Sequence, residues 1–574
     1  MYSNYKSIQI LLALLKKYNV RNIITSPGGS NTPIVHSIEN DAYFKTYSVV
    51  DERSAVYFGI GIAQIINEPV ACLCTSGTAV SNYLPGMTEA YYQNVPIIAI
   101  TADKNPYFTG QLEIQKTEQR NIFGDVSKKS VDLPLCNTDD EEWYCARLIK
   151  EALLASSHHG KGPVHINIPL VGSYANYNVK ELPEISPITV INCENSEEVW
   201  KGCINVLKES KKILIIVGQN ILFSEEDKNN IETFFAKFNC VISVEHLSNL
   251  ECEGTVFTYP VTETGNTKEP DLVPDLVISM GNNLANYGMK PFLRRNCKQI
   301  QHFAIDEGGR VRDVYQSLTT IFECTPSYFF RFFAKNDSGS SNNQQYYNAW
   351  KNESESIVLP EFDFSNFYLA KQLSCIIPEN SILHLAILNS ARVMQFFELA
   401  KGVRVHSNVG ALGIDGCLST FMGHAAVTEE LAFLVIGDLS FFYDMNAAGI
   451  KHLDKNVRII LLNNGGGAEF QFFLNKKDIP TLNENICAEH RKIAKGWISS
   501  LGYEYQSVTT KEQLNDVFDS FAEKSDRPKF LEVFTKMEED AFITREFYNI
   551  NQQNRSVMQK AKGVAFRLKN KISK

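Results

Sequence analysis

Asp438 and the segment Asn464–Gly467 carry residue types that bind metal and phosphate, and each follows an apolar run. The runs, Leu431–Ile436 and Val457–Leu462, are typical of buried strands, and a helical stretch joins them. Such a βαβ unit brings both polar segments to the carboxyl edge of one parallel sheet, where ligands bind. A carboxylate, an amide oxygen and glycine carbonyls suit a hard cation such as Mg²⁺ that also holds phosphate oxygens. The residues alone predict a metal–diphosphate site, although Asp-Leu-Ser at a strand end is also an ordinary helix N-cap.

Glu52 is the second residue whose position suggests chemistry. It follows the expected strand Tyr47–Val50 and comes shortly before an apolar helical segment, Ala55–Ile66. An acidic residue at this point either belongs to a site at the strand end or complements the positive end of the helix dipole. The residues alone leave these two interpretations open.

Three longer segments resemble the thiamine diphosphate (ThDP) enzymes. They are GDLS…YDMN…NNGGG around Asp438 and Asn464, DERSAVYFGIGIA from Asp51, and TSGTAVSNYLPGMTEAYY from Thr75. Within that class they resemble the synthases of 2-succinyl-5-enolpyruvyl-6-hydroxy-3-cyclohexene-1-carboxylate (SEPHCHC) in menaquinone biosynthesis, which join decarboxylated 2-oxoglutarate to isochorismate. The resemblance implies a ThDP- and Mg²⁺-dependent carboligase, with Mn²⁺ able to replace Mg²⁺.

The resemblance also implies roles for individual residues. Asp438 and Asn464 are the implied side-chain ligands of the metal, and Gly466 is the implied backbone ligand. Glu52 is the implied catalytic residue: it bonds the N1′ atom of the aminopyrimidine ring, and an apolar pocket is expected to raise the pKa of its carboxyl group. Ile414 is expected to hold the cofactor in a bent shape. The full set of implied cofactor-binding residues is Glu52, Thr78, Gly410, Leu412, Ile414, Asp438, Leu439, Ser440 and Asn464.

The implied substrate-facing positions depart from the family pattern. Arginine is expected where this chain has Ser30, Val409 and Met394, and an apolar residue is expected where it has Glu469. A hydrogen bond to a charged group is worth about 1.5–3 kcal/mol, so losing two or three arginines would weaken acid binding roughly 10³-fold or more. We therefore expect altered substrates, with an acceptor less acidic than isochorismate, and expect Glu469 to repel acids. The substrate positions are Gly29, Ser30, Gln115, Lys290, Arg392, Glu469 and Phe470.

Three other functions remain open at this stage. One is the authentic SEPHCHC synthase with a rearranged carboxylate site, and another is a simple 2-oxo acid decarboxylase. The third is a non-catalytic ThDP-binding protein, against which the retained Glu52 and metal motif argue. For a carboligase the expected partners are a 2-oxo acid donor and a carbonyl or enoyl acceptor, whereas CO₂ release without an acceptor would favour the simple decarboxylase. The resemblance further implies a homodimer or homotetramer, because the pyrimidine and diphosphate domains of one site come from different subunits in this family.

The elements that must position these residues alternate between helix and strand. This pattern predicts an α/β protein with parallel, helix-covered sheets. The resemblance implies three doubly wound, mainly parallel-sheet domains, the architecture of pyruvate decarboxylase-like ThDP enzymes. The expected parts are a pyrimidine-binding domain at 1–175, a central α/β domain at 190–335, a linker at 336–358, a diphosphate- and metal-binding domain at 359–545, and a basic tail at 546–574. The central domain has no glycine-rich phosphate loop, so FAD is not expected. Its expected strands are Ile213–Val217, Cys240–Val244, Leu276–Ser279 and Gln301–Ile305.

Composition narrows the remaining possibilities. The net charge of -9 leaves no basic footprint for nucleic acid. The 13 cysteines are scattered without a CxxC pair, which favours reduced thiols in a cytoplasmic protein. The apolar run Ile8–Leu15 is too short to span a membrane. The tail is basic from Arg555 onward. Its charge and apolar spacing predict a solvated or frayed terminal helix or, as a weaker alternative, a helix that contacts a membrane surface.

Overall fold

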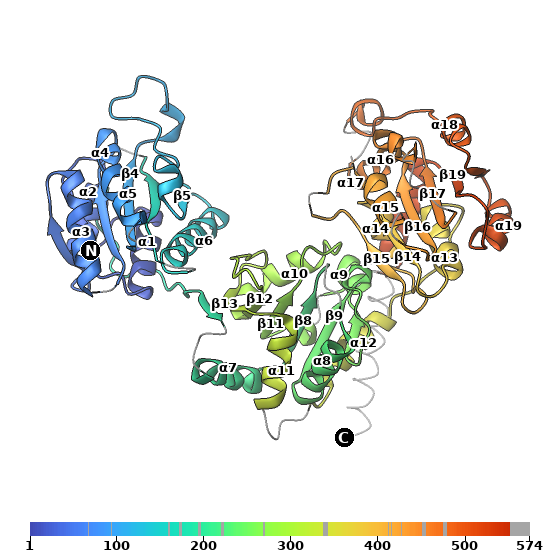
Figure 1. Ribbon diagram of the computed structural model, residues 1–574, viewed down its shortest axis with the longest axis horizontal. Coiled ribbons are helices and arrows are strands. Elements are labelled where there is room, and N and C mark those ends of the chain that lie inside the picture. Colours follow the sequence, from blue (N-terminus) through green and yellow to red (C-terminus); the bar gives the residue numbers. More distant parts are fainter. Residues whose placement is uncertain are drawn as a thin grey trace, which may run out of the picture. The chain divides into compact units, whose positions relative to one another are not determined.

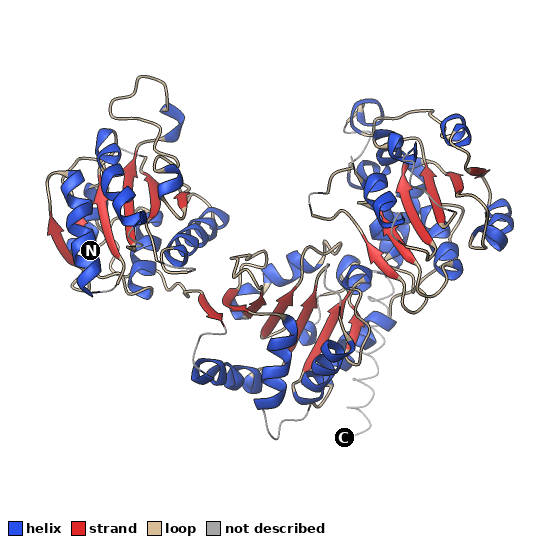
Figure 2. Ribbon diagram, viewed as in Figure 1, coloured by secondary structure: helices blue, strands red, loops and turns tan. Residues whose placement is uncertain are grey.

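The computed structural model describes residues 1–66, 68–92, 95–158, 161–171, 175–192, 197–219, 223–267, 270–336, 342–410, 412–414, 416–425, 428–449, 455–474 and 479–551. The chain forms two compact units. Unit 1 comprises Met1–Thr189 and Val311–Thr319, and unit 2 comprises Val190–Arg310 and Thr320–Lys574. Figures 1 and 2 show three sheets with helices around them, the first in unit 1 and the other two mainly in unit 2.

Each sheet has its own strand order. The first is ordered β2-β1-β3-β4-β6-β5, the second β10-β9-β8-β11-β12-β13-β7, and the third β15-β14-β16-β17-β19-β18. The strands are β1 (Asn22–Thr25), β2 (Lys45–Ser48), β3 (Val70–Cys74), β4 (Ile97–Asp103), β5 (Ser130–Asp132), β6 (Val164–Pro169), β7 (Thr189–Asn192), β8 (Ile213–Val217), β9 (Cys240–Val244), β10 (Thr255–Phe257), β11 (Leu276–Met280), β12 (Gln301–Ile305), β13 (Leu318–Glu323), β14 (Ile382–Leu385), β15 (Arg404–His406), β16 (Ala432–Gly437), β17 (Val457–Asn463), β18 (Glu504–Val508) and β19 (Lys529–Phe534).

Helices connect the strands within each sheet. They are α1 (Lys6–Lys17), α2 (Thr32–Glu39), α3 (Glu52–Ile66), α4 (Thr78–Asn82), α5 (Leu84–Tyr92), α6 (Asp139–Ala155), α7 (Glu197–Glu209), α8 (Glu225–Lys237), α9 (Tyr259–Glu263), α10 (Met289–Arg295), α11 (Pro326–Asn336), α12 (Gln345–Glu355), α13 (Asn366–Ile376), α14 (Asn389–Met394), α15 (Cys417–Ala425), α16 (Asp438–Tyr443), α17 (Ala468–Phe473), α18 (Lys495–Ser500) and α19 (Lys511–Phe521).

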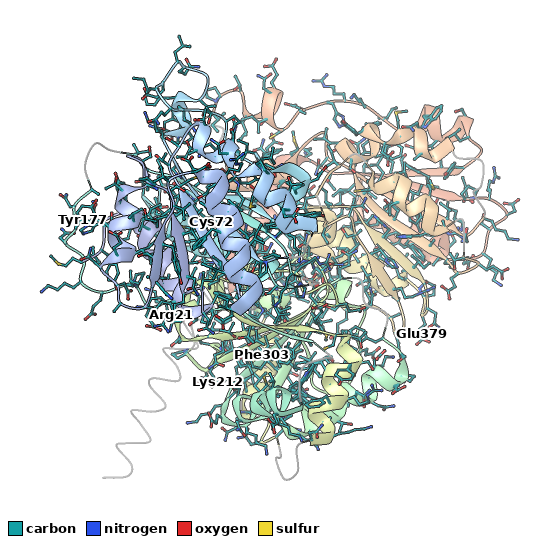
Figure 3. The ribbon with its side chains drawn as sticks, turned by 60° about the vertical axis from the view of Figure 1, so that its left-hand side comes forward. Arg21, Cys72, Tyr177, Lys212, Phe303 and Glu379 are labelled. Atoms are coloured by element: carbon teal, nitrogen blue, oxygen red, sulfur yellow. The ribbon has the colours of Figure 1, made fainter. Side chains whose placement is uncertain are left out.

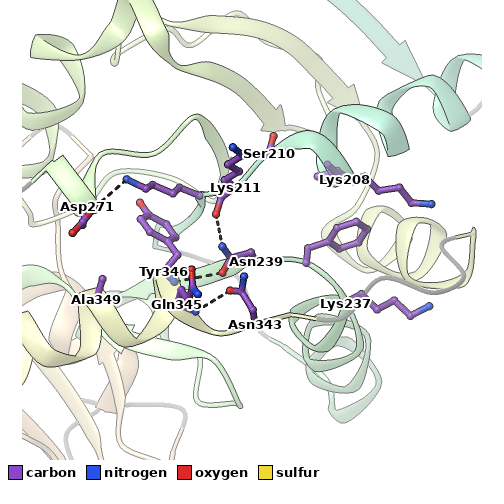
Figure 4. A pocket seen from close by; sticks show the side chains of 13 residues that line it. Lys208, Ser210, Lys211, Lys237, Asn239, Asp271, Asn343, Gln345, Tyr346 and Ala349 are labelled. Carbon is purple, nitrogen blue, oxygen red and sulfur yellow. Dashed lines mark hydrogen bonds and ion pairs between the residues drawn. The ribbon is translucent and has the colours of Figure 1, made fainter.

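The first sheet is buried on both faces. Successive strand residues point to opposite faces, so Ile23 and Leu73 pack in one core with α1, α2 and α6, whereas Ile24 and Cys72 pack in another with α3 and α5. Burial on both faces explains why β3 and β4 are buried along their whole length and read as continuous apolar runs. Cys72, labelled in Figure 3, is fully buried, and burial raises the pKa of its thiol.

The sheets are parallel. Every pairing in the first and third sheets runs parallel, as do the pairings that join β10, β9, β8, β11 and β12 in the second. The carboxyl ends of the strands in each sheet therefore share one edge. The predicted fold class, three α/β domains with mainly parallel sheets, is confirmed.

Buried strands were easier to predict than edge strands. The expected segments Ile213–Val217, Cys240–Val244 and Gln301–Ile305 coincide with β8, β9 and β12. The expected strand Tyr47–Val50 instead lies at Lys45–Ser48, because β2 is an edge strand whose residues are half-buried or exposed and show no clear apolar run.

The segment expected to be a linker contains a helix. Residues 336–358 include α12, in which Tyr346 and Trp350 are buried one helical turn apart. Trp350 packs edge-on against Phe292 with ring centroids 5.9 Å apart, and the Tyr346 hydroxyl donates to the Leu272 carbonyl oxygen at 2.9 Å. These aromatic anchors order the carboxyl-terminal half of the expected linker against the central domain. Residues 337–341, with the sequence DSGSS, lie outside the described residues.

No described helix combines the length and apolar character needed to cross a membrane. The cysteines in the described part of the chain are all free thiols. The basic tail from residue 552 onward lies outside the described residues.

Candidate active site

Asp438 and Asn464 follow the neighbouring strands β16 and β17, whose parallel pairing places both residues at one edge of the third sheet. The buried Asp438 carboxylate accepts hydrogen bonds from the backbone N–H groups of Leu439 (2.6 Å), Gly465 (2.8 Å) and Gly466 (3.0 Å). Burial raises the pKa of Asp438 to about 6, while these backbone donors act to lower it. The glycine turn after β17 thus orients the Asp438 carboxylate, which follows β16.

Only glycine fits this turn at Gly466. Its φ is +152°, and a Cβ there would lie 2.6 Å from the carbonyl oxygen of Cys487 and 2.9 Å from the Met537 sulfur. Among the described residues, the Gly466 carbonyl oxygen accepts one hydrogen bond, from the Ala468 N–H at 3.1 Å. A carbonyl oxygen has a second lone pair, so this contact leaves room for a further ligand.

The Asn464 side chain is oriented by a buried carboxylate. Its Nδ2 donates to Asp540 Oδ2 at 3.1 Å, and Asp540 also accepts from Thr535 Oγ1 (2.7 Å) and from the Asn366 N–H (2.9 Å). Because an ionised carboxylate can only accept hydrogen bonds, the amide oxygen must point the other way. That oxygen is buried and has no hydrogen-bond partner in the described structure. An unpaired buried oxygen beside the Asp438 carboxylate fits a hard cation.

Sequence reasoning did not select His490, which lies against this edge. Its Nδ1 accepts from the Lys492 N–H at 3.1 Å, so in the neutral ring the proton sits on Nε2, 3.4 Å from Asp438 Oδ2. Burial lowers the pKa of His490 and favours the neutral ring. His490 occupies a loop without any motif, so no sequence pattern indicated it.

The loop after β15 carries the remaining expected cofactor positions of unit 2. The Ser440 hydroxyl donates to the Ile414 carbonyl oxygen at 2.8 Å, which ties this loop to α16. The Gly410 carbonyl oxygen accepts from Asn283 Nδ2 at 3.2 Å. Leu412 is exposed and has a φ of +57°, an uncommon conformation for a residue other than glycine. The structure therefore brings Ile414, Ser440 and Asp438 together, while Gly410 lies against the central domain.

The expected residues of unit 1 lie at the carboxyl edge of the first sheet. Glu52 is the first residue of α3, after β2, and is half-buried within this unit. Ser30 bonds the hydroxyl of Ser76 at 3.0 Å, in the turn after β3. Thr78 and Gln115 flank the same turn, and a Cβ at Gly77 would lie 3.5 Å from that of Gln115. Gly29, before Ser30, is exposed and has no neighbour that a side chain would meet.

A buried ion pair holds the loop that carries Gln115. Lys116 Nζ lies 2.7 Å from Asp103 Oδ2, with side chains 2% and 4% exposed. Asn167 Nδ2 donates to the same carboxylate at 3.1 Å, and Gln119 Oε1 accepts from the Gly77 N–H at 3.1 Å. The loop is therefore fixed to β4, to β6 and to the turn after β3. Sequence reasoning missed this pair, because nothing in the spacing of Asp103 and Lys116 indicates that they meet.

The expected substrate residues of unit 2 include a buried ion pair. Arg392 Nη1 donates to Glu469 Oε1 at 2.6 Å, and Arg392 Nε lies 3.8 Å from Glu263 Oε1. The guanidinium carbon lies 4.6 Å from the centre of the Tyr287 ring. Glu469 is therefore paired with Arg392 in this structure and is not the isolated negative charge that the sequence suggested.

Burial and charge act in opposite directions on these groups. Burial acts to lower the pKa of Arg392, and the carboxylates of Glu469 and Glu263 act to raise it. The charges outweigh burial, so the pKa of Arg392 lies above its usual value. Burial raises the pKa of Glu263, against the effect of Arg392. Lys290, on α10, is half-buried, and Phe470 is exposed beside Glu469.

Comparison with known proteins identifies the class first. Residues 6–125 match the family described as "Thiamine pyrophosphate enzyme, N-terminal TPP binding domain". Together with the parallel α/β sheets and the motif at Asp438 and Asn464, this match defines a ThDP enzyme.

Relatives extend the match to nearly the whole chain. Proteins from Bacteroides thetaiotaomicron and Bacteroides fragilis, both named 2-succinyl-5-enolpyruvyl-6-hydroxy-3-cyclohexene-1-carboxylate synthase, are 37% and 38% identical and cover 96% of this chain and 99% of their own. A protein of the same name from Porphyromonas gingivalis is 30% identical over 95% of this chain and 97% of its own. The chain belongs to the SEPHCHC synthase family, whose members are ThDP-dependent enzymes that form C–C bonds. These relatives give no support to the expected change of substrates.

Proposed function

We propose that this enzyme makes SEPHCHC by decarboxylating 2-oxoglutarate and adding the remaining four-carbon unit to isochorismate. The observation that carries this proposal is the similarity to SEPHCHC synthases over 96% of the chain. It is supported by the metal motif, in which the oriented Asn464 amide leaves one buried oxygen without a partner. Asp438, Asn464 and the Gly466 carbonyl would hold Mg²⁺, and Ser440 would lie beside the diphosphate.

The residues of this chain would divide the work around the cofactor. When bound, ThDP supplies a carbon nucleophile and a sink for the electrons released with CO₂. Glu52 would exchange a proton with N1′ of the aminopyrimidine ring, a task for a carboxyl group shielded from water. Ile414, held through its carbonyl oxygen by Ser440, would contact the cofactor and help to fix its shape. Gln115 and Ser30, on the fixed loops of unit 1, would face the substrates.

We further propose a homodimer or homotetramer with sites completed by two subunits. Glu52 and the metal motif belong to separate compact units of the chain, and Glu52 is only half-buried within its own unit. Size-exclusion chromatography with light scattering measures the assembly. Co-expression of two inactive variants, Glu52→Gln and Asp438→Asn, should restore part of the activity if each site takes Glu52 from one chain and Asp438 from another. A monomer with full activity would contradict this arrangement.

The substrates can be tested with one assay. The purified enzyme, loaded with ThDP and Mg²⁺, is given 2-oxoglutarate and isochorismate, and the product is identified by mass spectrometry. Efficient consumption of both, with SEPHCHC as product, supports the proposal. CO₂ release from a different 2-oxo acid, with isochorismate left intact, would refute it.

A second candidate is the same chemistry with a less acidic acceptor. This candidate is favoured by two positions at which the chain has an apolar residue in place of the family's arginine. They are Val409 and Met394, which are 4% and 1% exposed and lie in the apolar core of the third sheet. Neither can bind a carboxylate where the family pattern has arginine. The same assay, run with neutral aldehydes and ketones as acceptors, distinguishes the two candidates.

A further inference from the structure

Arg392 and Glu469 lie on either side of the metal-binding strand end. α14 follows β14, α17 follows β17, and β16 with Asp438 lies between these two strands in the third sheet. Neighbouring strands are about 4.8 Å apart, so the ion pair bridges strand ends roughly 10 Å apart. It therefore lies at the carboxyl edge, where parallel sheets bind their ligands.

The described structure shows one hydrogen bond between the two side chains, although an arginine and a carboxylate can form two. Arg392 Nη1 donates to Glu469 Oε1 at 2.6 Å, whereas Glu469 Oε2 is buried and has no hydrogen-bond partner in the described structure. Arginine–carboxylate pairs frequently form two parallel hydrogen bonds, and this pair forms one. An unpaired buried acceptor is destabilising and calls for an explanation. Glu469 is thus a poor permanent partner for this arginine.

Arg392 nevertheless needs an anion at all times. Its side chain is 9% exposed and stacks on Tyr287, and Glu263 remains 3.8 Å from its Nε. A buried guanidinium left without its close carboxylate would be strongly destabilised. A site that binds an acid through such an arginine therefore needs an internal carboxylate when the acid is absent.

We propose that Arg392 is the receptor for a substrate carboxylate and that Glu469 occupies it until the substrate binds. This inference rests on the proposed function, in which both substrates are acids. Binding then exchanges one carboxylate for another, and the incoming acid can use two hydrogen bonds where Glu469 uses one. The Glu469 side chain is 12% exposed and its neighbour Phe470 is 40% exposed, so the displaced carboxylate has a short way to solvent. Arg392 in this way supplies a guanidinium that Ser30, Val409 and Met394 lack.

The alternative is an ion pair that only joins α14 to α17. The two roles predict opposite effects of removing Glu469. An internal competitor weakens the binding of external carboxylates, so its removal strengthens that binding. A structural partner positions Arg392, so its removal leaves carboxylate binding unchanged or weaker.

The test measures the affinity of the ThDP- and Mg²⁺-loaded enzyme for glutarate by calorimetry. Glutarate carries the two carboxylates of the proposed donor but cannot be decarboxylated as a 2-oxo acid, so the result does not depend on turnover. The variants are Glu469→Gln, Arg392→Met and the double variant, with Glu484→Gln as a control that removes an exposed carboxylate. Glu469→Asp, which keeps the charge but shortens the reach to Arg392, serves if the amide variant does not fold.

We expect Glu469→Gln to bind glutarate about 10-fold more tightly than the wild type, since one competing charged hydrogen bond is removed. Glu469→Asp should also tighten binding, and Glu484→Gln should leave it unchanged. Arg392→Met should abolish glutarate binding in both the wild-type and the Glu469→Gln background. The inference is overturned if Glu469→Gln binds glutarate no better than the wild type, if Arg392→Met still binds it, or if no form binds it. The proposed function fails separately, when 2-oxoglutarate and isochorismate are not consumed.

Discussion

Glu245 should be a neutral acid at physiological pH, and its removal should therefore stabilise the protein. It follows β9, is 4% exposed, and accepts a hydrogen bond from the Ala285 N–H at 2.7 Å through Oε1, while Oε2 has no partner in the described structure. Burial raises the pKa of Glu245 from its ordinary 4.5 to about 8, the Ala285 N–H opposes this, and the nearby Glu263 adds to it.

The magnitude follows from the shift in pKa. Between pH 4.5 and 8 the unfolded chain has lost this proton while the folded chain keeps it. The folded state therefore binds more protons, and stability falls as pH rises, by about 1.4 kcal/mol per pH unit. The loss is absent below pH 4.5 and reaches about 5 kcal/mol at pH 8 and above. Glutamine at this position cannot ionise, so Glu245→Gln escapes the loss.

The assay is the melting temperature of the wild type and of Glu245→Gln from pH 5 to pH 9 at constant ionic strength. One kcal/mol corresponds to roughly 2–4 °C for a domain of this size, so the variant should melt roughly 10 °C above the wild type at pH 9 and close to it at pH 5. Glu253→Gln, which changes an exposed carboxylate, should follow the wild type throughout. Parallel curves for Glu245→Gln and wild type would refute the assignment of a neutral buried acid.

Three further changes probe the site and its support. Gly466→Ala should weaken Mg²⁺-dependent ThDP binding at least about 10-fold, because a strained φ and a clash cost about 1–3 kcal/mol each; calorimetry should show no such loss for Gly496→Ala, where a Cβ meets nothing within 4 Å. Lys116→Met should lower stability by about 3–5 kcal/mol, since it leaves Asp103 buried and unpaired, and an unchanged melting temperature would argue against the pair. Asn464→Leu should lower Mg²⁺ affinity about 10-fold or more by removing an oxygen ligand, as measured by metal titration of ThDP binding; equal affinity would exclude Asn464 as a ligand.

The buried strands and the motif residues could be predicted because their information is local. Strands β8 and β9 are buried along their whole length and are apolar apart from Ser243, so hydrophobicity marks their bounds. In β12 only the last three residues are apolar, and they carry the signal. Asp438 and Asn464 could be placed side by side because consecutive parallel strands share a carboxyl edge. The short edge strands β5 and β10, three residues each, carry no comparable signal.

The long-range polar contacts could not be predicted. The pairing of Arg392 with Glu469 joins residues 77 positions apart, and that of Lys116 with Asp103 depends on how one loop folds back. Glu469 was therefore expected to act as an isolated negative charge, although in the folded protein it is paired with Arg392. The helix α12 was missed for a related reason, because its aromatic anchors bind a surface that local composition does not reveal.

The central claim is that Glu52 and the motif at Asp438 and Asn464 act on one ThDP molecule. The exchange rate of the thiazolium C2 proton of bound ThDP in D₂O, followed by NMR after acid quench, tests this most directly. Glu52→Gln should still bind ThDP and Mg²⁺ but exchange the proton at least about 10²-fold more slowly than the wild type, while Glu39→Gln, an exposed acid in the same unit, should exchange normally. Equal exchange rates in Glu52→Gln and the wild type would contradict the account.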